Sequence, residues 1–381
     1  MDFDFTWLLW GLPVAFGLGW VASRLDLRQW RIESRQAPKA YFRGLNHLLN
    51  EQQDQAIDAF IEAVQGDPDT AELHFALGNL FRRRGDYDRA VRVHEHLLSR
   101  DDLGRKDRDR AQHALALDFL KAGLLDRAEA ALLKLQGSAF EGEALLALLA
   151  IYERSRDWPQ AKAIALRLDE VEQGSFAPRI AHHLCEEADQ AQRTGDTGTA
   201  RARLEEAVQR APQVARGWMA LSALRAQSGD ATGAYDALTR LATHAPQAVP
   251  LAAAPLADLA RQCGRQADAI RLLEGFDERA PSIDVTEALA QLANDPAQAR
   301  QRYLRHLARE KSLVLATHWL KVEPLSDPVA KEPVQAALEQ ASAPLRRYRC
   351  AACGFEARQH FWHCPGCQAW DSYPARRVEE I

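Results

Sequence analysis

Recognisable catalytic motifs are absent from this sequence. It contains no glycine-rich phosphate-binding loop, no G-x-S-x-G nucleophile elbow and no H-E-x-x-H metal motif. It also lacks an excess of positive charge, because 48 Lys and Arg residues stand against 53 Asp and Glu, a net charge of −5. That balance gives no reason to expect nucleic-acid binding by the whole protein. We therefore predict no catalytic residues and a function that rests on binding.

Residues that favour strands are sparse. Alanine and leucine dominate a composition that is 47% hydrophobic and 27% charged, and β-branched residues are few. Both properties favour helix. A chain of 381 residues is long enough for two or more domains with a large buried surface. We predict an all-α fold, apart from a short segment at the C-terminus.

Cysteine is scarce outside that segment. Four of the six cysteines form two C-x-x-C pairs with ten residues between them, a spacing unlike that of a secreted disulfide framework. Both sulfurs of a C-x-x-C turn can point at one ion, and two such turns make a tetrahedral four-sulfur site suited to zinc or a single iron. We predict one metal ion, iron or zinc, within residues 346–374. Its ligands would be Cys350, Cys353, Cys364 and Cys367.

The segments CAACGF and CPGCQAWDSYP resemble the metal-binding knuckles of rubredoxin. Two departures favour a structural or docking module over an electron carrier, which remains an alternative. The interval between the pairs is shorter than in full-length rubredoxins, and Gln368 replaces the usual second glycine. A nucleic-acid-binding ribbon is a further alternative; it would place Arg346, Arg347 and Arg349 on phosphates, with an affinity that falls steeply with salt.

An uncharged hydrophobic run lies at the N-terminus. Residues 5–23, FTWLLWGLPVAFGLGWVAS, would form about 28 Å of helix, enough to cross the hydrocarbon core of a bilayer. Acidic residues precede the run and a basic segment, residues 24–36, follows it, the reverse of a cleaved signal peptide. The positive-inside rule then predicts a single-pass anchor over residues 1–23, with a periplasmic N-terminus and a cytoplasmic remainder.

The middle of the chain repeats itself. An alanine recurs at intervals of 34, 38, 33, 39, 34 and 35 residues, with a turn glycine before it and a large apolar residue after it in most copies. This pattern resembles the tetratricopeptide repeat, a helical hairpin of about 34 residues. We expect seven repeats over residues 37–282. The alanines are Ala56, Ala90, Ala128, Ala161, Ala200, Ala234 and Ala269.

Stacked hairpins bury a continuous core that no single hairpin can bury, and they curve to form a concave groove. In the second repeat, Phe75, Asn79 and Arg82 are candidate partner-binding residues of that groove. The copy at Ala161 departs most from the pattern, because Arg156 occupies its turn position.

The C-terminal third contains two further segments. Residues 283–322 read as further helices or a degenerate repeat, and the proline-bearing residues 323–345 as a linker with one short helix.

The order of these parts resembles the lipopolysaccharide assembly protein B family of Gram-negative bacteria over essentially the whole chain. The resemblance implies a non-enzymatic inner-membrane adaptor that brings the deacetylase LpxC to the membrane protease FtsH and so limits lipopolysaccharide synthesis. It also implies a membrane-embedded sensor and lipopolysaccharide-assembly proteins as partners, and a homo-oligomer is compatible with it. A generic membrane-anchored scaffold for envelope assembly is the main alternative, because no residue pattern names the client.

The predicted orientation can be tested by protease protection. Protease added to intact spheroplasts should leave a C-terminal tag undigested, because the positive-inside rule places the cysteine-rich tail on the cytoplasmic side. Detergent-permeabilised cells, in which the tag should disappear, are the control. Digestion of the tag in intact spheroplasts would contradict the orientation.

Overall fold

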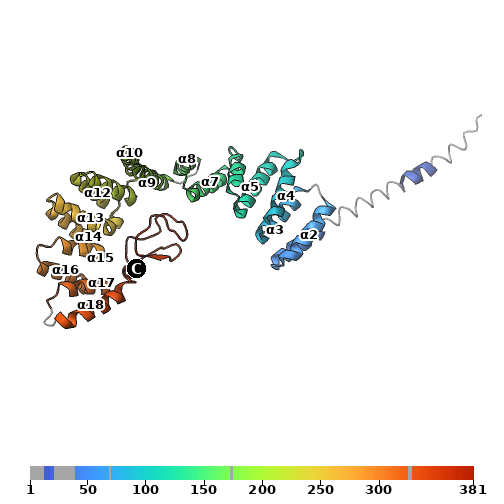
Figure 1. Cartoon of the computed structure of the whole chain (residues 1–381). Helices are drawn as coiled ribbons and strands as arrows, with labels where there is room; N and C mark the ends of the chain where they lie inside the picture. The colour runs from blue at the N-terminus through green and yellow to red at the C-terminus, as the bar shows by residue number, and fades with distance from the viewer. Residues whose placement is uncertain (1–12, 21–38, 68–69, 172–174, 325–327) are drawn as a thin grey trace, which may run out of the picture. The chain divides into compact units, whose positions relative to one another are not determined.

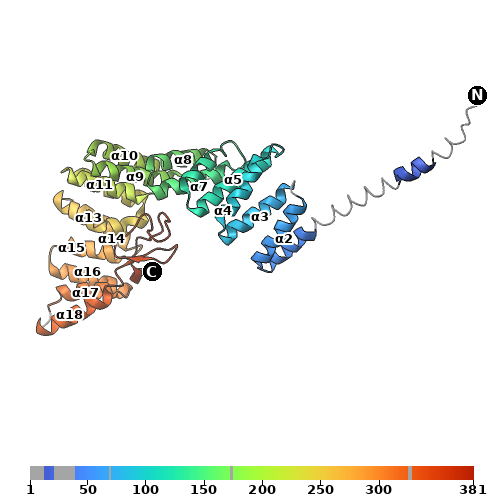
Figure 2. The ribbon, with the colours of Figure 1, turned by 45° about the vertical axis from the view of Figure 1, so that its right-hand side comes forward.

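The protein is described by a computed structural model that covers residues 13–20, 39–67, 70–171, 175–324 and 328–381. It divides into two compact units, residues 1–155 (unit 1) and residues 156–381 (unit 2), which are drawn in Figures 1 and 2.

The predicted anchor and the basic segment after it fall mainly outside the described residues. Of residues 5–23, the structure describes residues 13–20, which are helical. No helix in the described ranges is both long enough and apolar enough to cross a bilayer.

Unit 1 consists of helices that pack against their neighbours in the sequence. Residues 39–49 form the first of these helices. It is followed by α2 (Gln53–Gly66), α3 (Ala71–Arg84), α4 (Tyr87–Ser99), α5 (Arg105–Ala122), α6 (Leu125–Leu133) and α7 (Glu141–Ser155).

Unit 2 continues the helical pattern and ends in a small two-stranded ribbon. Its helices are α8 (Trp158–Val171), α9 (Ala177–Arg193), α10 (Thr197–Arg210), α11 (Ala215–Gln227), α12 (Ala231–His244), η1 (Pro246–Ala248), α13 (Val249–Gln262), α14 (Gln266–Asp277), α15 (Ile283–Gln291), α16 (Pro296–Arg309), α17 (Leu313–Val322) and α18 (Pro328–Ser342). The strands β1 (Tyr348–Arg349) and β2 (Glu356–Ala357) pair antiparallel, with Tyr348 opposite Ala357, and η2 (Val378–Glu380) follows. The chain is therefore mostly helical, as its composition predicts.

The repeat register is the same in all seven copies. Each of the seven predicted alanines is 0% exposed. Five residues before each alanine, the backbone is left-handed, and two of these seven turns lack glycine. In the fourth copy Arg156 takes a φ of 59° there, so this copy keeps the register despite its divergent sequence. The seven left-handed residues are Glu51, Gly85, Gly123, Arg156, Gly195, Gly229 and Gly264.

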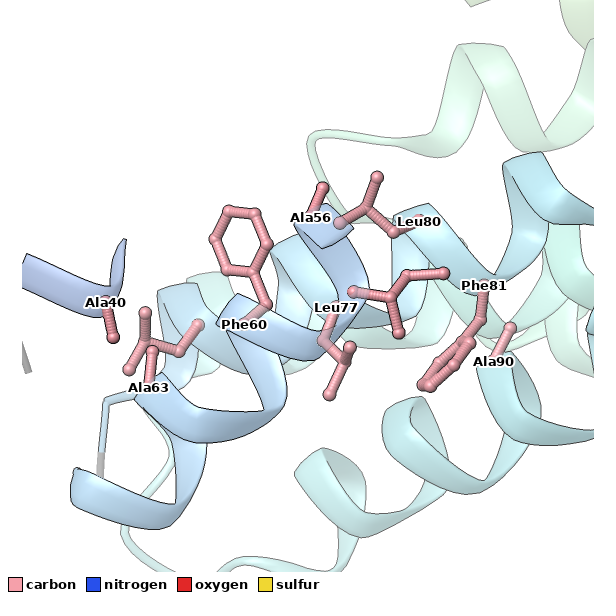
Figure 3. Close-up of a cluster of buried hydrophobic side chains, with 10 residues drawn as sticks. Ala40, Ala56, Phe60, Ala63, Leu77, Leu80, Phe81 and Ala90 are labelled. Carbon is pink, nitrogen blue, oxygen red and sulfur yellow. The ribbon is translucent and has the colours of Figure 1, made fainter. Parts of the chain in front are cut away.

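The two helices of a repeat cross where the first one carries a small residue. A Cβ atom added to Gly44 would lie 2.7 Å from the ring of Phe60, and one added to Gly78 would lie 2.5 Å from the ring of His94. Figure 3 shows Phe60 within the buried cluster of the first repeats. In these two copies the first helix therefore has glycine at the crossing, because the residue sixteen positions later carries a ring that fills the space. Four other copies combine Ala or Ser with leucine at these positions: Ala116/Leu132, Ala188/Leu204, Ser222/Leu238 and Ala257/Leu273.

This volume trade-off predicts strong coupling between Gly44 and Phe60. Gly44→Ala should lower the free energy of unfolding by about 1 to 3 kcal/mol, because the core has no room for the methyl group. In a Phe60→Leu background the same change should cost much less, because alanine and leucine are the combination that other copies use. The measurement is a double-mutant cycle from urea unfolding curves.

Gly275→Ala is the matched control. Gly275 lies within α14 and has open space where a Cβ would be, so alanine should be neutral or stabilising there. An equal loss for Gly44→Ala in both backgrounds would contradict the volume argument.

Candidate metal centre and its attachment to the repeats

The four predicted thiol ligands lie together at the end of unit 2. All four Sγ atoms are within 4.8 Å of one another. Cys350 and Cys367 have their Sγ atoms 3.8 Å apart, and Cys353 and Cys364 have theirs 3.7 Å apart. A tetrahedral ion with metal–sulfur bonds of about 2.3 Å requires sulfur–sulfur distances of about 3.8 Å. The donor set and its spacing therefore fit one zinc or iron ion.

Two equivalent turns hold these sulfurs. The amide of Gly354 donates to the carbonyl of Cys350 at 2.9 Å, and the amide of Gln368 donates to the carbonyl of Cys364 at 2.8 Å. Both donors are left-handed, with φ of 78° for Gly354 and 60° for Gln368. Gln368 therefore adopts the backbone of the glycine it replaces, at a cost of about 1 kcal/mol. The sequence departure leaves the second turn intact.

The environment of the thiols favours a bound cation. A hydrogen bond with Ser372, 3.2 Å away, lowers the pKa of Cys350 to about 6. The Phe355 amide would lower the pKa of Cys353, but desolvation and hydrogen bonds with the other three thiols raise it to about 12. Four adjacent thiols thus cannot all ionise by themselves, whereas a metal cation would neutralise the thiolates. Bound zinc would supply a structural cross-link, and bound iron would add one-electron exchange.

The ribbon is attached to α9 through an aromatic and a polar contact. His182 of α9 is 1% exposed, and its Nε2 atom lies 2.8 Å from Oδ2 of Asp371. Its ring stacks on Trp370, with centroids 4.6 Å apart and planes at 23°. Trp158 of α8 meets the same indole edge-on, at 6.4 Å. Trp370 therefore joins the ribbon to the repeats.

A second attachment joins the ribbon to α15. Both oxygens of Asp284 accept hydrogen bonds from Arg377, at 2.6 and 2.9 Å. The same guanidinium lies 4.2 Å from the centroid of the Tyr348 ring in β1. A bidentate ion pair of this kind fixes both distance and orientation. Arg377 therefore connects β1 to α15.

The residues after Arg377 bind two helix N-termini. The carboxylate of Glu380 accepts a hydrogen bond from the Ile283 amide at 2.8 Å, at the start of α15. The carboxylate of Glu379 accepts from Ser312 at 2.6 Å and from the Val314 amide at 3.2 Å, at the start of α17. Negative charge at a helix N-terminus satisfies free amides and complements the helix dipole.

The ribbon is thereby part of the core of unit 2. Cys350 and Cys364 are 1% and 0% exposed, in one buried cluster with Tyr348 and Tyr373, and Leu251 of α13 packs against it. Figures 1 and 2 both show the loops of the metal-binding ribbon beside α13–α15. Cys353 and Cys367 are exposed, so the site is covered by protein on one side and open on the other.

The three candidate partner-binding residues of the second repeat have structural contacts of their own. Phe75 is 2% exposed and packs beneath the Arg110 guanidinium, so it does not line an open groove as expected. Arg82 donates to Asp118 at 2.9 Å and to the side-chain oxygen of Asn79 at 2.5 Å. Asp118 also contacts His94, and both are 0% exposed.

These bonds tie the second repeat to the third. Asn79 and Arg82 remain partly exposed, and partner binding by them stays a prediction.

The fold and the four-thiol site define a tetratricopeptide-repeat protein with a rubredoxin-like metal-binding domain. Residues 73–106 match the tetratricopeptide repeat family, and residues 348–373 match the family described as rubredoxin metal binding domain. The chain belongs to the lipopolysaccharide assembly protein B family, which confirms the resemblance inferred from its motifs.

Three comparisons give the extent of the similarity. Lipopolysaccharide assembly protein B of Escherichia coli K12 is 31% identical, over 97% of this chain and 98% of that protein. The protein of the same name from Haemophilus influenzae is 26% identical, over 95% of this chain and 96% of its own length. A tetratricopeptide repeat protein from Parabacteroides merdae, of known structure, is 13% identical with a TM-score of 0.35, over 68% of this chain and all of that chain.

The attachment at His182 predicts a pH dependence. Burial lowers the pKa of His182, although Asp371 opposes the shift. When the ribbon is detached, His182 can bind a proton below about pH 6.5. The free energy of ribbon attachment should therefore become less favourable as pH falls from 7.5 to 5.5, by at most about 1.4 kcal/mol per pH unit. The measurement is hydrogen exchange at Asp371, whose amide donates to the Trp362 carbonyl, after correction for intrinsic rates.

His182→Gln should reduce this pH dependence. His113→Gln is the control, because burial also lowers the pKa of His113, which lies in unit 1. Identical pH profiles for wild type and His182→Gln would contradict the assignment.

Proposed function

We propose that this chain is a non-enzymatic inner-membrane adaptor of lipopolysaccharide assembly, which limits lipid A synthesis by presenting an LpxC-like deacetylase to the membrane protease FtsH. The observation that carries the proposal is similarity to curated proteins named for lipopolysaccharide assembly over 97% of the chain. The combination of helical repeats and an attached metal ribbon supports protein binding as the mode of action.

Proximity is the proposed mechanism. A single-pass anchor with a periplasmic N-terminus would hold the repeats and the ribbon at the cytoplasmic face, beside a membrane protease. A client bound there meets the protease at a raised effective concentration, without chemistry by the adaptor. A membrane-embedded sensor and lipopolysaccharide-assembly proteins would act through the same anchored complex.

Rigid attachment of the ribbon supports a composite binding surface. The ion pair of Arg377 with Asp284 and the stacking of Trp370 on His182 hold ribbon and repeats in one geometry. A surface that is already ordered loses less entropy when a partner binds. In unit 1, Asn79 and Arg82 are the proposed client contacts, since Asp118 fixes the Arg82 guanidinium before any partner arrives.

The test is depletion of the protein in its native host, followed by measurement of the deacetylase half-life. Depletion should lengthen the half-life, and the wild-type chain should restore it. Cys364→Ser combined with Cys367→Ser should bind no metal and fail to restore it, because the ribbon is too small to fold without its ion. Cys263→Ser, a half-buried cysteine outside the site, is the matched control and should restore normal turnover.

Two results would change the proposal. An unchanged half-life on depletion would leave the generic envelope-assembly scaffold. Normal client turnover with the metal-free double variant would show that the adaptor works without its metal site.

A further inference from the structure

A cavity of about 380 Å³ lies where the ribbon meets the repeats in unit 2. Its walls come from α15, α17, the residues after α18, and both sides of the two-stranded ribbon. Three arginines face it: Arg346, Arg358 and Arg377. Neither metal binding nor the proposed adaptor function involves this cavity.

Arg346 presents an unpaired edge within the structure. Its Nε and Nη2 atoms are both buried, and neither has a hydrogen-bond partner in the described part of the chain. These two nitrogens form the edge of a guanidinium that binds two oxygens of one carboxylate or phosphate group. Leaving buried donors unpaired is unfavourable for folding. A bound anion with two oxygens would remove that penalty.

The acidic residues in the cavity are already engaged. Asp284 binds Arg377 through both oxygens, and Glu287 lies 2.9 Å from Nδ1 of His318. Neither Arg346 nor Arg358 has an ion pair among the described residues. The lining thus carries three arginines against two carboxylates, one positive charge in excess, and Glu339 of α18 lies within electrostatic range of Arg346.

The number of acceptor oxygens decides between the candidate anions. A carboxylate carries one negative charge, whereas a phosphomonoester carries about −1.5 to −2 at pH 7 and offers three acceptor oxygens. Three acceptor oxygens can bind the two-nitrogen edge of Arg346 and the Arg358 guanidinium at once, so the phosphomonoester matches the lining better. The volume admits a phosphate group together with a small substituent.

We propose that this cavity is a binding site for a phosphomonoester, with Arg346 binding two phosphate oxygens through Nε and Nη2 and Arg358 supplying the second positive charge. The ligand would bridge the ribbon to α15 and α17, and so strengthen the attachment of the metal domain to the repeats. A soluble phosphomonoester and a lipid headgroup share this chemistry.

The experiment uses the full-length, metal-loaded protein in detergent, titrated calorimetrically with inorganic phosphate, glycerol 3-phosphate and acetate at constant ionic strength. We expect saturable binding of one phosphate or glycerol 3-phosphate, and at least tenfold weaker binding of acetate. Arg346→Gln should weaken phosphate binding at least tenfold. Arg346→Lys, which keeps the charge and loses the two-nitrogen edge, should also weaken it. Arg349→Gln is the matched control, because Arg349 pairs with the half-buried Glu356 outside the cavity, so this change should leave binding unchanged.

Thermal unfolding supplies a second, independent measurement. Phosphate should raise the Tm of the wild type and not that of Arg346→Gln. In phosphate-free buffer Arg346→Gln should have a Tm equal to or above that of the wild type, because it removes unpaired buried donors. A lower Tm in that buffer would mean that Arg346 already has a structural partner, and would overturn the proposal.

Further outcomes distinguish a soluble ligand from a lipid headgroup and identify the results that would overturn the site. Binding of glycerol 3-phosphate in solution assigns a soluble phosphomonoester, and binding only to protein-reconstituted vesicles that contain phosphatidic acid assigns a lipid headgroup. Absence of saturable binding in both formats would overturn the site. So would an equal loss of affinity in Arg346→Gln and Arg349→Gln, which would indicate unspecific charge attraction. These measurements use purified protein, so their result is independent of deacetylase turnover.

Discussion

A ribbon of 26 residues (348–373) has too little apolar surface to stay folded by itself, and that shortage governs the C-terminal unit. Two supports compensate for it. Within the ribbon, four sulfurs converge at the spacing of a tetrahedral ion. Outside it, the ion pair of Arg377 with Asp284 and the stacked ring of His182 join it to the helices. The ribbon therefore depends on both metal binding and attachment to the repeats to stay folded.

The attachment also explains the polar character of the surrounding residues. Glu380 satisfies the Ile283 amide at the start of α15, whose N-cap Ser282 makes no side-chain cap bond, and Glu379 adds to the Ser312 cap at the start of α17. The tail after the ribbon thus stabilises the helices that carry the ribbon. Removal of either partner leaves free amides or an unpaired charge on the other, so the two are expected to form and fail together.

Unit 1 shows a different use of buried polar groups. His94 occupies the position where other copies have leucine or phenylalanine, and its ring requires glycine at position 78. Asp118 binds both His94 and Arg82, so one carboxylate connects two successive repeats. A hydrogen-bonded connection of this kind fixes the relative rotation of the hairpins, which apolar packing alone leaves less defined. This is why Arg82 is structurally fixed before any partner is considered.

The sequence by itself determined the helical repeats, their register and the four thiols, because each depends on short-range periodicity. The repeated alanine, and the glycine five positions before it in five of the seven copies, recur in the chain, and C-x-x-C spacing is local. Local patterns could not reveal that Phe75 is covered, or that Arg156 adopts the turn of a glycine. Only the tertiary structure brought His182 to Asp371 and Arg377 to Asp284, which lie 189 and 93 residues apart. Such pairs leave no periodic trace, because their geometry depends on how the helices of unit 2 pack against the ribbon.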